Sequence, residues 1–176
     1  MKFIETKIKG AFVIELERLE DERGFFARTW DSNEFTAKGL NPKLAQCSIS
    51  FNKNKGTLRG MHWQATPHVE AKVVRCTTGA IYDVILDLRP DSPTFKQWFS
   101  VELTAENWKE LYIPEGVAHG FQALSDNSEV YYQISEYYHP ESAKGVRWND
   151  PAFNIKWPLS VTEISPKDSA YSDWKL

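Results

Sequence analysis

The stretch Ile81-Tyr82-Asp83-Val84-Ile85-Leu86-Asp87-Leu88 is almost continuously apolar, as expected for the central strand of a sheet. Turn-forming residues follow at Pro90–Pro93, and Gln97–Leu103 then alternates in part between polar and apolar side chains, which is typical of a strand with one solvent-facing side. The chain contains seven further strand-like runs, separated mostly by short turns: Phe12–Glu17, Cys47–Asn52, Thr57–Gln64, Lys72–Thr77, Lys109–Ile113, Gly120–Leu124 and Val130–Tyr138. Many short strands predict an all-β fold, an antiparallel sandwich or barrel.

Two segments depart from this pattern. One short helix is predicted from Ser32 to Lys38, with its N-cap at Asp31 or at the first residue itself. The segment from Trp157 onward is polar and loop-like but long for a frayed end, and it contains Ser165–Asp168. We therefore expect an extended C-terminal segment that folds back over a site.

Length and composition restrict the class of protein. The 176 residues contain no repeat and no linker, so residues 1–176 are expected to form a single domain. A net charge of −3 offers no basic face for nucleic acid or an anionic membrane. No apolar run approaches the ~20 residues of a membrane span, and the N-terminus lacks a signal-peptide core. We expect a cytoplasmic protein with neither a nucleic-acid nor a membrane partner.

The segment Leu58–Gln64 is the densest in groups that can carry chemistry. On a regular strand, His62 shares its face with Gly60 and Gln64, whereas Arg59 points to the other face. A histidine on a strand is more often structural than catalytic when taken alone. The polar neighbour and the space left by the glycine favour a site that lines the barrel.

A second run, Pro114–Phe121, is similar to the turn of cupin barrels whose histidine, here His119, often helps to hold a metal. Such a site also needs a His-x-His pair and a glutamate. This chain has His62-Trp63-Gln64 instead, and His68 and Glu70 lie in a proline-containing connection. We therefore predict no metal and no cofactor for the reaction.

The run Val130–Tyr138 is rich in tyrosine, and two interpretations of it stay open. Cross-strand aromatic pairs would stabilise a sheet. Alternatively, tyrosine hydroxyls on one face would project into a pocket as proton donors.

Seven motifs recur in order and with matching spacing in one known family. Together they resemble dTDP-4-dehydrorhamnose 3,5-epimerase, and the resemblance extends to about Asp168. It implies a cupin-type antiparallel β-barrel (jelly roll) and a cofactor-free epimerase of a 4-keto-6-deoxy nucleotide sugar in deoxysugar biosynthesis. The motifs are Arg23-Gly24-Phe25-Phe26, Arg59-Gly60-Met61-His62, Lys72-Val73-Val74-Arg75-Cys76, Asp91-Ser92-Pro93-Thr94-Phe95, Ile113–Phe121, Tyr137-Tyr138-His139-Pro140-Glu141 and Arg147-Trp148-Asn149-Asp150-Pro151.

The resemblance assigns catalytic roles that suit the chemistry. A C4 ketone acidifies the hydrogens on C3 and C5, and inversion then needs a base on one face, an acid on the other and a donor at the enolate oxygen. By resemblance, His62 is the base, Asp168 orients its imidazole, Lys72 stabilises the enolate and Tyr132 returns a proton from the opposite face.

The resemblance also implies substrate contacts and a homodimer. His119 matches a position near the sugar, Arg59 a diphosphate contact and Tyr138 a residue against the nucleotide. Arg23 and Phe26 match nucleotide contacts that, in the family, come from the neighbouring subunit.

Arg28, Gln46 and Ser48 are three further expected substrate contacts. Two of them, Arg28 and Ser48, differ from the family pattern. Arg28 stands where the family has an acidic residue, and arginine can only donate hydrogen bonds where glutamate would accept them. Two positions after Gln46, Ser48 stands where the family favours asparagine. These departures leave the nucleobase open.

Several alternative functions are compatible with the same expected β-barrel. One is a single-centre epimerase or a 3,4-ketoisomerase of a CDP-, GDP- or other nucleotide 4-ketosugar; His62 with Tyr132 favours epimerisation. The others are a non-catalytic sugar-binding cupin, against which these two residues argue together with Lys72 and Asp168, and a metal-dependent cupin.

Overall fold

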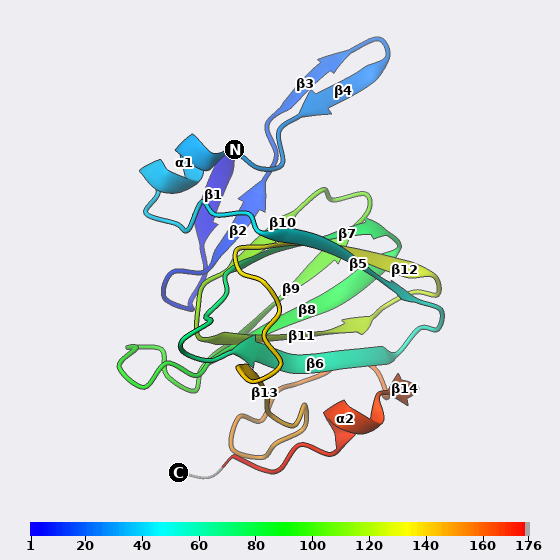
Figure 1. Ribbon diagram of the computed structural model, residues 1–176. Coiled ribbons are helices and arrows are strands. Elements are labelled where there is room, and N and C mark those ends of the chain that lie inside the picture. Colours follow the sequence, from blue (N-terminus) through cyan, green and yellow to red (C-terminus); the bar gives the residue numbers. More distant parts are fainter. Residues whose placement is uncertain (175–176) are drawn as a thin grey trace.

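Two β-sheets pack face to face and enclose the core (Figure 1). The computed structural model describes residues 1–174. The first sheet has the order β1-β2-β10-β7-β12-β5 and is antiparallel throughout. Its strands are β1 (Lys2–Glu5), β2 (Phe12–Glu15), β10 (Glu110–Ile113), β7 (Lys72–Thr78), β12 (Ser128–Ile134) and β5 (Gln46–Asn52).

The second sheet has the order β13-β6-β11-β8-β9, again antiparallel. The C-terminal strand β14 adds to β6 in parallel, which brings the end of the chain beside the second sheet. The strands are β13 (Ala143–Gly145), β6 (Thr57–Gln64), β11 (Val117–Ala123), β8 (Ala80–Asp87), β9 (Trp98–Thr104) and β14 (Glu163–Ile164). The all-β expectation is confirmed.

The sequence analysis did not predict a hairpin that lies outside both sheets. Within residues 1–174, strands β3 (Arg18–Asp21) and β4 (Gly24–Ala27) pair only with each other, and in Figure 1 they project away from the two sheets. Seven of the eight residues in these two strands are exposed, including Phe25 and Phe26, so no alternation between buried apolar and exposed polar side chains marks them in the sequence. Strands β1, β13 and β14 were missed as well.

All nine expected strands are present, and the largest errors lie at two boundaries. Strand β11 begins at Val117, three residues before the expected start. Strand β12 ends at Ile134, four residues before the expected end. Ile134 pairs with the first residues of both neighbouring strands, Gln46 and Lys72, and within residues 1–174 both ladders end there.

Two short helices complete the structure of residues 1–174. Helix α1 (Ser32–Ala37) confirms the predicted helix, and its N-cap is Asp31, which accepts hydrogen bonds from the amides of Asn33 and Glu34 at 2.9 and 3.2 Å. Helix α2 (Pro166–Ser169) lies in the C-terminal segment. No helix within residues 1–174 is long and apolar enough to cross a membrane.

The main core lies between the sheets. Fully buried side chains such as Val74 and Val130 from the first sheet meet Ile81, Ile85 and Phe121 from the second. Each side chain of this size contributes roughly 1.5–3 kcal/mol when it is buried completely. This packing holds β6, β7, β11 and β12 rigidly around the space that they leave open.

A β-bulge in β6 changes which side chains face that space. His119 of β11 pairs with His62, yet Phe121, two residues later, pairs with Arg59, three residues earlier on β6. The extra residue reverses the alternation of β6. The prediction that Arg59 and His62 occupy opposite faces is therefore wrong, because both line the same cavity.

Candidate active site

A cavity of about 1070 Å³ opens between the two sheets, and the C-terminal segment forms part of its wall. This volume suits a ligand of nucleotide-sugar size. Nine of the twelve residues expected at the site line it: Gln46, Ser48, Arg59, His62, Lys72, His119, Tyr132, Tyr138 and Asp168. They come from five strands, from helix α2 and from the segment after β12.

His62 and Asp168 form a hydrogen-bonded pair in the cavity wall. His62 Nε2 lies 2.6 Å from Asp168 Oδ1, and the Gly60 amide donates to Asp168 Oδ2 at 3.1 Å. The carboxyl group is buried, whereas the imidazole is partly open to the cavity. When Nε2–H donates to the carboxylate, the lone pair of the neutral ring sits on Nδ1. No group within residues 1–174 hydrogen bonds that nitrogen, so it can accept a proton.

Opposing influences set the charge of Asp168. Burial acts to raise the pKa of its carboxyl, but hydrogen bonds from His62 and the Gly60 amide, together with a bond involving Ser165, outweigh burial and hold the pKa below its ordinary value. The Asp168 amide donates to Ser165 Oγ at 3.0 Å, which caps helix α2. Asp168 is consequently a fixed carboxylate at neutral pH.

Tyr132 projects into the same cavity from β12. Its hydroxyl lies 3.0 Å from Ser50 Oγ, and its ring meets that of His119 edge to face at 6.2 Å. Burial raises the pKa of the Tyr132 hydroxyl well above its usual value, so the group keeps its proton at neutral pH. Of the two interpretations of the tyrosine-rich strand, the structure favours a hydroxyl in a pocket for this tyrosine.

Lys72 supplies a positive charge from β7. Its Nζ lies 2.7 Å from Glu70 Oε1, and both side chains are largely shielded from solvent. An ion pair in such surroundings needs good geometry to offset its desolvation. The pairing orients the ammonium group along the cavity wall.

A second histidine–carboxylate pair adjoins the first. His119 Nε2 lies 2.6 Å from Asp83 Oδ1, and His119 is the cross-strand neighbour of His62. Asp83 is fully buried on β8, and within residues 1–174 its second oxygen has no hydrogen-bond partner. The sequence analysis missed Asp83, although a carboxylate inside an apolar strand is a signal of such a role.

This architecture and its sequence match one family. The family model for dTDP-4-dehydrorhamnose 3,5-epimerase matches residues 5–175. The dTDP-4-dehydrorhamnose 3,5-epimerase of Methanothermobacter thermautotrophicus is 43% identical over 177 residues, covering 99% of this chain and 93% of that protein. The chain belongs to the dTDP-4-dehydrorhamnose 3,5-epimerase family. It is therefore an isomerase.

Solved structures of the epimerase family share the whole fold. The enzyme from Elizabethkingia anophelis superposes with a TM-score of 0.95 at 37% identity, covering 99% of this chain and 96% of that one. The Bacillus anthracis enzyme, solved with TDP and PPi bound, superposes with a TM-score of 0.93 at 39% identity, covering 98% of this chain and 99% of that one. The expected cupin-type barrel is confirmed.

Three expected substrate contacts lie outside the cavity of this epimerase chain. Arg23 and Phe26 lie on the projecting β3–β4 hairpin and are exposed; Arg23 is paired with Asp21. Arg28 follows the hairpin, and its Nη1 lies 3.5 Å from Asp31 Oδ2. None of the three lines the cavity formed by residues 1–174.

Other residues that line the cavity of the epimerase were not anticipated. Lys144 on β13 and Lys167 on α2 add positive charge, and neither lysine stands in a catalytic or aromatic motif that would single it out in the sequence. Tyr171 lies with its ring 6.1 Å from the ring of His62. The expectation that the C-terminal segment folds over the site is confirmed.

Proposed function

We propose that this epimerase inverts C3 and C5 of a dTDP-4-keto-6-deoxy sugar by proton transfer through an enolate. The observation that carries the proposal is the His62–Asp168 pair in one cavity with the protonated hydroxyl of Tyr132. A base with its orienting carboxylate and a separate acid are what inversion at a carbon next to a ketone requires.

In the first step, His62 Nδ1 takes the proton from the carbon next to the ketone. The electron pair of the broken C–H bond moves onto the C4 oxygen and gives an enolate. The imidazole becomes an imidazolium, which the Asp168 carboxylate 2.6 Å from Nε2 stabilises. Asp168 acts on the substrate only through this ring.

The enolate oxygen then needs positive charge or hydrogen-bond donors. Lys72 and His119 line the cavity from opposite sheets, and Glu70 and Asp83 orient them. A fixed ammonium group in a partly desolvated cavity stabilises the developing negative charge more strongly than water does. We assign Lys72 the main part of this stabilisation.

Tyr132 completes the inversion by giving its proton to the carbon from the opposite face. The resulting tyrosinate is a strong base in these surroundings because burial disfavours its charge. Ser50 Oγ, 3.0 Å from the tyrosine oxygen, is placed to donate a hydrogen bond to the tyrosinate until it regains a proton. The same pair acts at the second carbon after the sugar shifts in the cavity.

We expect the diphosphate to lie beside the positive side chains of the cavity. Arg59 is held by Asn52 Oδ1 at 2.8 Å and by the Phe51 carbonyl at 3.2 Å, so its guanidinium is preorganised for a phosphate. Lys144 and Lys167 line the same cavity. Gln46 and Ser48 then contact the rest of the substrate, with Tyr138 against the nucleotide.

The exposed hairpin supports a homodimer. Arg23 and Phe26 cannot contact substrate in the cavity of their own chain as the structure places them, but a projecting hairpin can reach a second copy. Strand β5 is the edge of the first sheet and exposes Ile49 and Phe51. An apolar edge strand of this kind is commonly covered by a partner.

Deuterium exchange tests the proposed reaction. The epimerase is incubated in D₂O with dTDP-, CDP-, GDP- and UDP-4-keto-6-deoxy sugars, and product stereochemistry and deuterium content are read by NMR. We expect inversion and deuterium at C3 and C5 with the dTDP sugar, and loss of activity in His62→Ala with unchanged folding by circular dichroism. Exchange at one carbon alone would indicate a single-centre epimerase. No exchange with any of these sugars would refute the proposal.

A further inference from the structure

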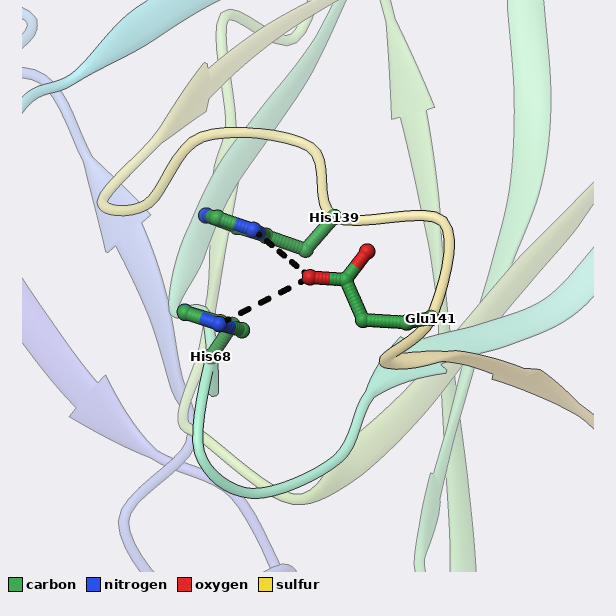
Figure 2. A group of neighbouring side chains, drawn as sticks. All are labelled: His68, His139 and Glu141. Carbon is green, nitrogen blue, oxygen red and sulfur yellow. Dashed lines mark hydrogen bonds and ion pairs between the residues drawn. The ribbon is translucent and has the colours of Figure 1, made fainter.

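Three side chains of metal-ligating type meet beside the cavity but outside the catalytic set: His68, His139 and Glu141 (Figure 2). Glu141 Oε1 lies 3.1 Å from His139 Nδ1 and 3.7 Å from His68 Nε2. The potential ligand atoms all lie within 4.8 Å of one another. Nothing in the proposed epimerisation uses this cluster.

Two segments far apart in the chain supply the cluster. His68 lies in the connection between β6 and β7, whereas His139 and Glu141 lie in the turn before β13. The His139 carbonyl accepts hydrogen bonds from the amides of Ser142 and Ala143, both at 3.0 Å, which fixes this turn. Its two ligands are therefore held close together by local backbone bonds.

One buried amide fastens both segments. Gln64 Nε2 donates to the carbonyls of His68 and Tyr137, each at 3.0 Å, and Gln64 Oε1 accepts from the His139 amide at 2.6 Å. The Gln64 side chain is buried, and it binds backbone rather than the imidazoles. The backbones that carry the two histidines are thus fixed before any ligand arrives, as preorganised sites require.

The spacing of the ligand atoms suits a small divalent ion. Zinc–nitrogen bonds of ~2.0–2.1 Å in a tetrahedron place neighbouring ligand atoms about 3.3 Å apart. The two nitrogen–oxygen distances, 3.1 and 3.7 Å, lie on either side of that value. The distances from Glu141 Oε1 to the two ring nitrogens therefore need little change.

The two imidazole rings must tilt to share an ion. They are stacked with centroids 3.5 Å apart and planes 4° from parallel. Metal binding needs each lone pair to point at the ion, so at least one ring turns out of the stack. The side chains of His68, His139 and Glu141 are 34, 29 and 64% exposed, which leaves room for this rotation and a path for the ion.

The type of ligand selects the class of ion. Two imidazoles with one carboxylate suit zinc and neighbouring transition metals, whereas calcium and magnesium prefer oxygen ligands throughout. An exposed glutamate is ionised at neutral pH, so Glu141 offers an anionic oxygen to the ion.

We propose that His68 Nε2, His139 Nδ1 and Glu141 Oε1 together bind one divalent transition-metal ion of the zinc type. Water completes its coordination on the exposed side. The ion joins the β6–β7 connection to the turn that follows Tyr138, a cavity residue, and so restrains the rim of the cavity. This site does not depend on the proposed catalytic roles.

Binding of Zn²⁺ alone to metal-free protein tests the proposal. The chain is stripped with a chelator, and Zn²⁺ is titrated against a competing indicator, with thermal unfolding as a second measurement. His62→Ala serves as a parallel background, because it removes the accessible catalytic imidazole. We expect one equivalent of Zn²⁺ in both proteins and an upward shift of the melting temperature. No saturable binding, or its loss in His62→Ala, would overturn the proposal.

Substitution then locates the ion. We expect His68→Gln, His139→Gln and Glu141→Gln each to weaken Zn²⁺ binding at least about tenfold, whereas Glu106→Gln, at an exposed loop, leaves it unchanged. Unaltered affinity in both histidine variants would assign the ion elsewhere and refute the site. If a variant is unstable, Co²⁺ bound to the unaltered chain gives the same answer. It should perturb the ring-proton NMR signals of His68 and His139 more strongly than those of His62 and His119, and the reverse pattern would refute the site.

Discussion

Asp168 Oδ1 lies 2.6 Å from His62 Nε2, although 106 residues separate the two along the chain. The C-terminal segment thus supplies the group that fixes the orientation of the proposed base. Asp168→Asn keeps the size of the side chain but removes the charge that stabilises the imidazolium. We expect kcat to fall by about 10²–10⁴-fold with a much smaller change in KM. Steady-state kinetics with the dTDP-4-keto sugar checks this, with the exposed Asp91→Asn as the control; equal losses in both variants would contradict it.

Tyr132→Phe should separate proton exchange from inversion. His62 can still remove a proton and return a solvent-derived deuteron to the same face, but no hydroxyl remains to protonate the other face. We expect inversion to fall by about 10²-fold or more while deuterium exchange with retained configuration persists. NMR of the recovered sugar measures both quantities. Ser50→Ala is the matched control, since it removes only the hydrogen-bond partner and should keep most of the inversion.

Gly60 permits the bulge that brings Arg59 and His62 to one cavity. Its φ of +108° is unfavourable for other residues, and an added Cβ would lie 2.6 Å from Gly120 Cα and from the His119 carbonyl oxygen. Gly60→Ala should lower the free energy of unfolding by about 3 kcal/mol or more through backbone strain and overpacking. Gly39→Ala is the control: φ is +70°, but apart from its chain neighbours no atom of residues 1–174 lies within 4 Å of an added Cβ. We expect this substitution to lower the free energy of unfolding by about 1 kcal/mol. Urea unfolding compares the two, and equal losses would show that the close approach of β6 and β11 is unimportant.

Glu110 makes stability depend on pH. Burial raises the pKa of its carboxyl from 4.5 to about 8, despite Arg75 Nη1 at 3.8 Å, and Glu110 Oε2 has no hydrogen-bond partner within residues 1–174. Between these two pKa values the folded state binds more protons than the unfolded state, so this group's contribution to stability falls as the pH rises through that window. Glu110→Gln cannot titrate. From pH 5 to pH 8.5 its free energy of unfolding should therefore rise by roughly 1–3 kcal/mol relative to that of the unaltered chain.

Chemical denaturation at several pH values measures that gain. The exposed Glu102→Gln on β9 is the control and should follow the unaltered chain at every pH. A constant difference between Glu110→Gln and the unaltered chain across the range would show that Glu110 is ionised throughout.

Much of the fold could be predicted because its strands carry local signals. The run Ile81–Leu88 forms β8 with nearly the expected bounds, and the helix after Asp31 begins at its predicted cap. The β3–β4 hairpin has no such signal. Its contacts outside the hairpin are made with a distant residue: Arg18 lies over the ring of Trp108, and Phe25 meets the same ring edge to face, and no short window of sequence contains all three.

In the candidate site, too, some features could be predicted from the sequence and others depend on long-range contacts. Resemblance identified nine residues that line the cavity, but regular alternation placed Arg59 on the wrong face. The bulge arises where Gly60 meets Gly120 of another strand, and such a meeting is a property of the pair of strands. Asp83 stands out in its apolar strand, but its pairing with His119 is a long-range contact, as is the approach of His68 to His139 and Glu141. Spacing along the chain cannot reveal these contacts.

The projecting hairpin leads to a prediction about subunits. If Arg23 and Phe26 complete the cavity of a partner chain, Phe26→Ala and His62→Ala damage different halves of the same site. A mixed dimer then contains one cavity with an intact base and an intact hairpin. Random mixing should restore activity to about a quarter of all sites, although neither variant alone is active at low substrate concentration.

Mixing the two variants after partial denaturation, followed by kcat/KM measurements, tests this arrangement. His62→Ala mixed with Asp168→Asn is the matched control. The proposed roles assign both residues to the cavity of their own chain, so each mixed dimer keeps two damaged sites and should not recover. Recovery limited to the hairpin pair would place the hairpin in the neighbouring subunit's site. Its absence, with mixed dimers confirmed by mass spectrometry, would instead mean that Arg23 and Phe26 take no part in the partner's site.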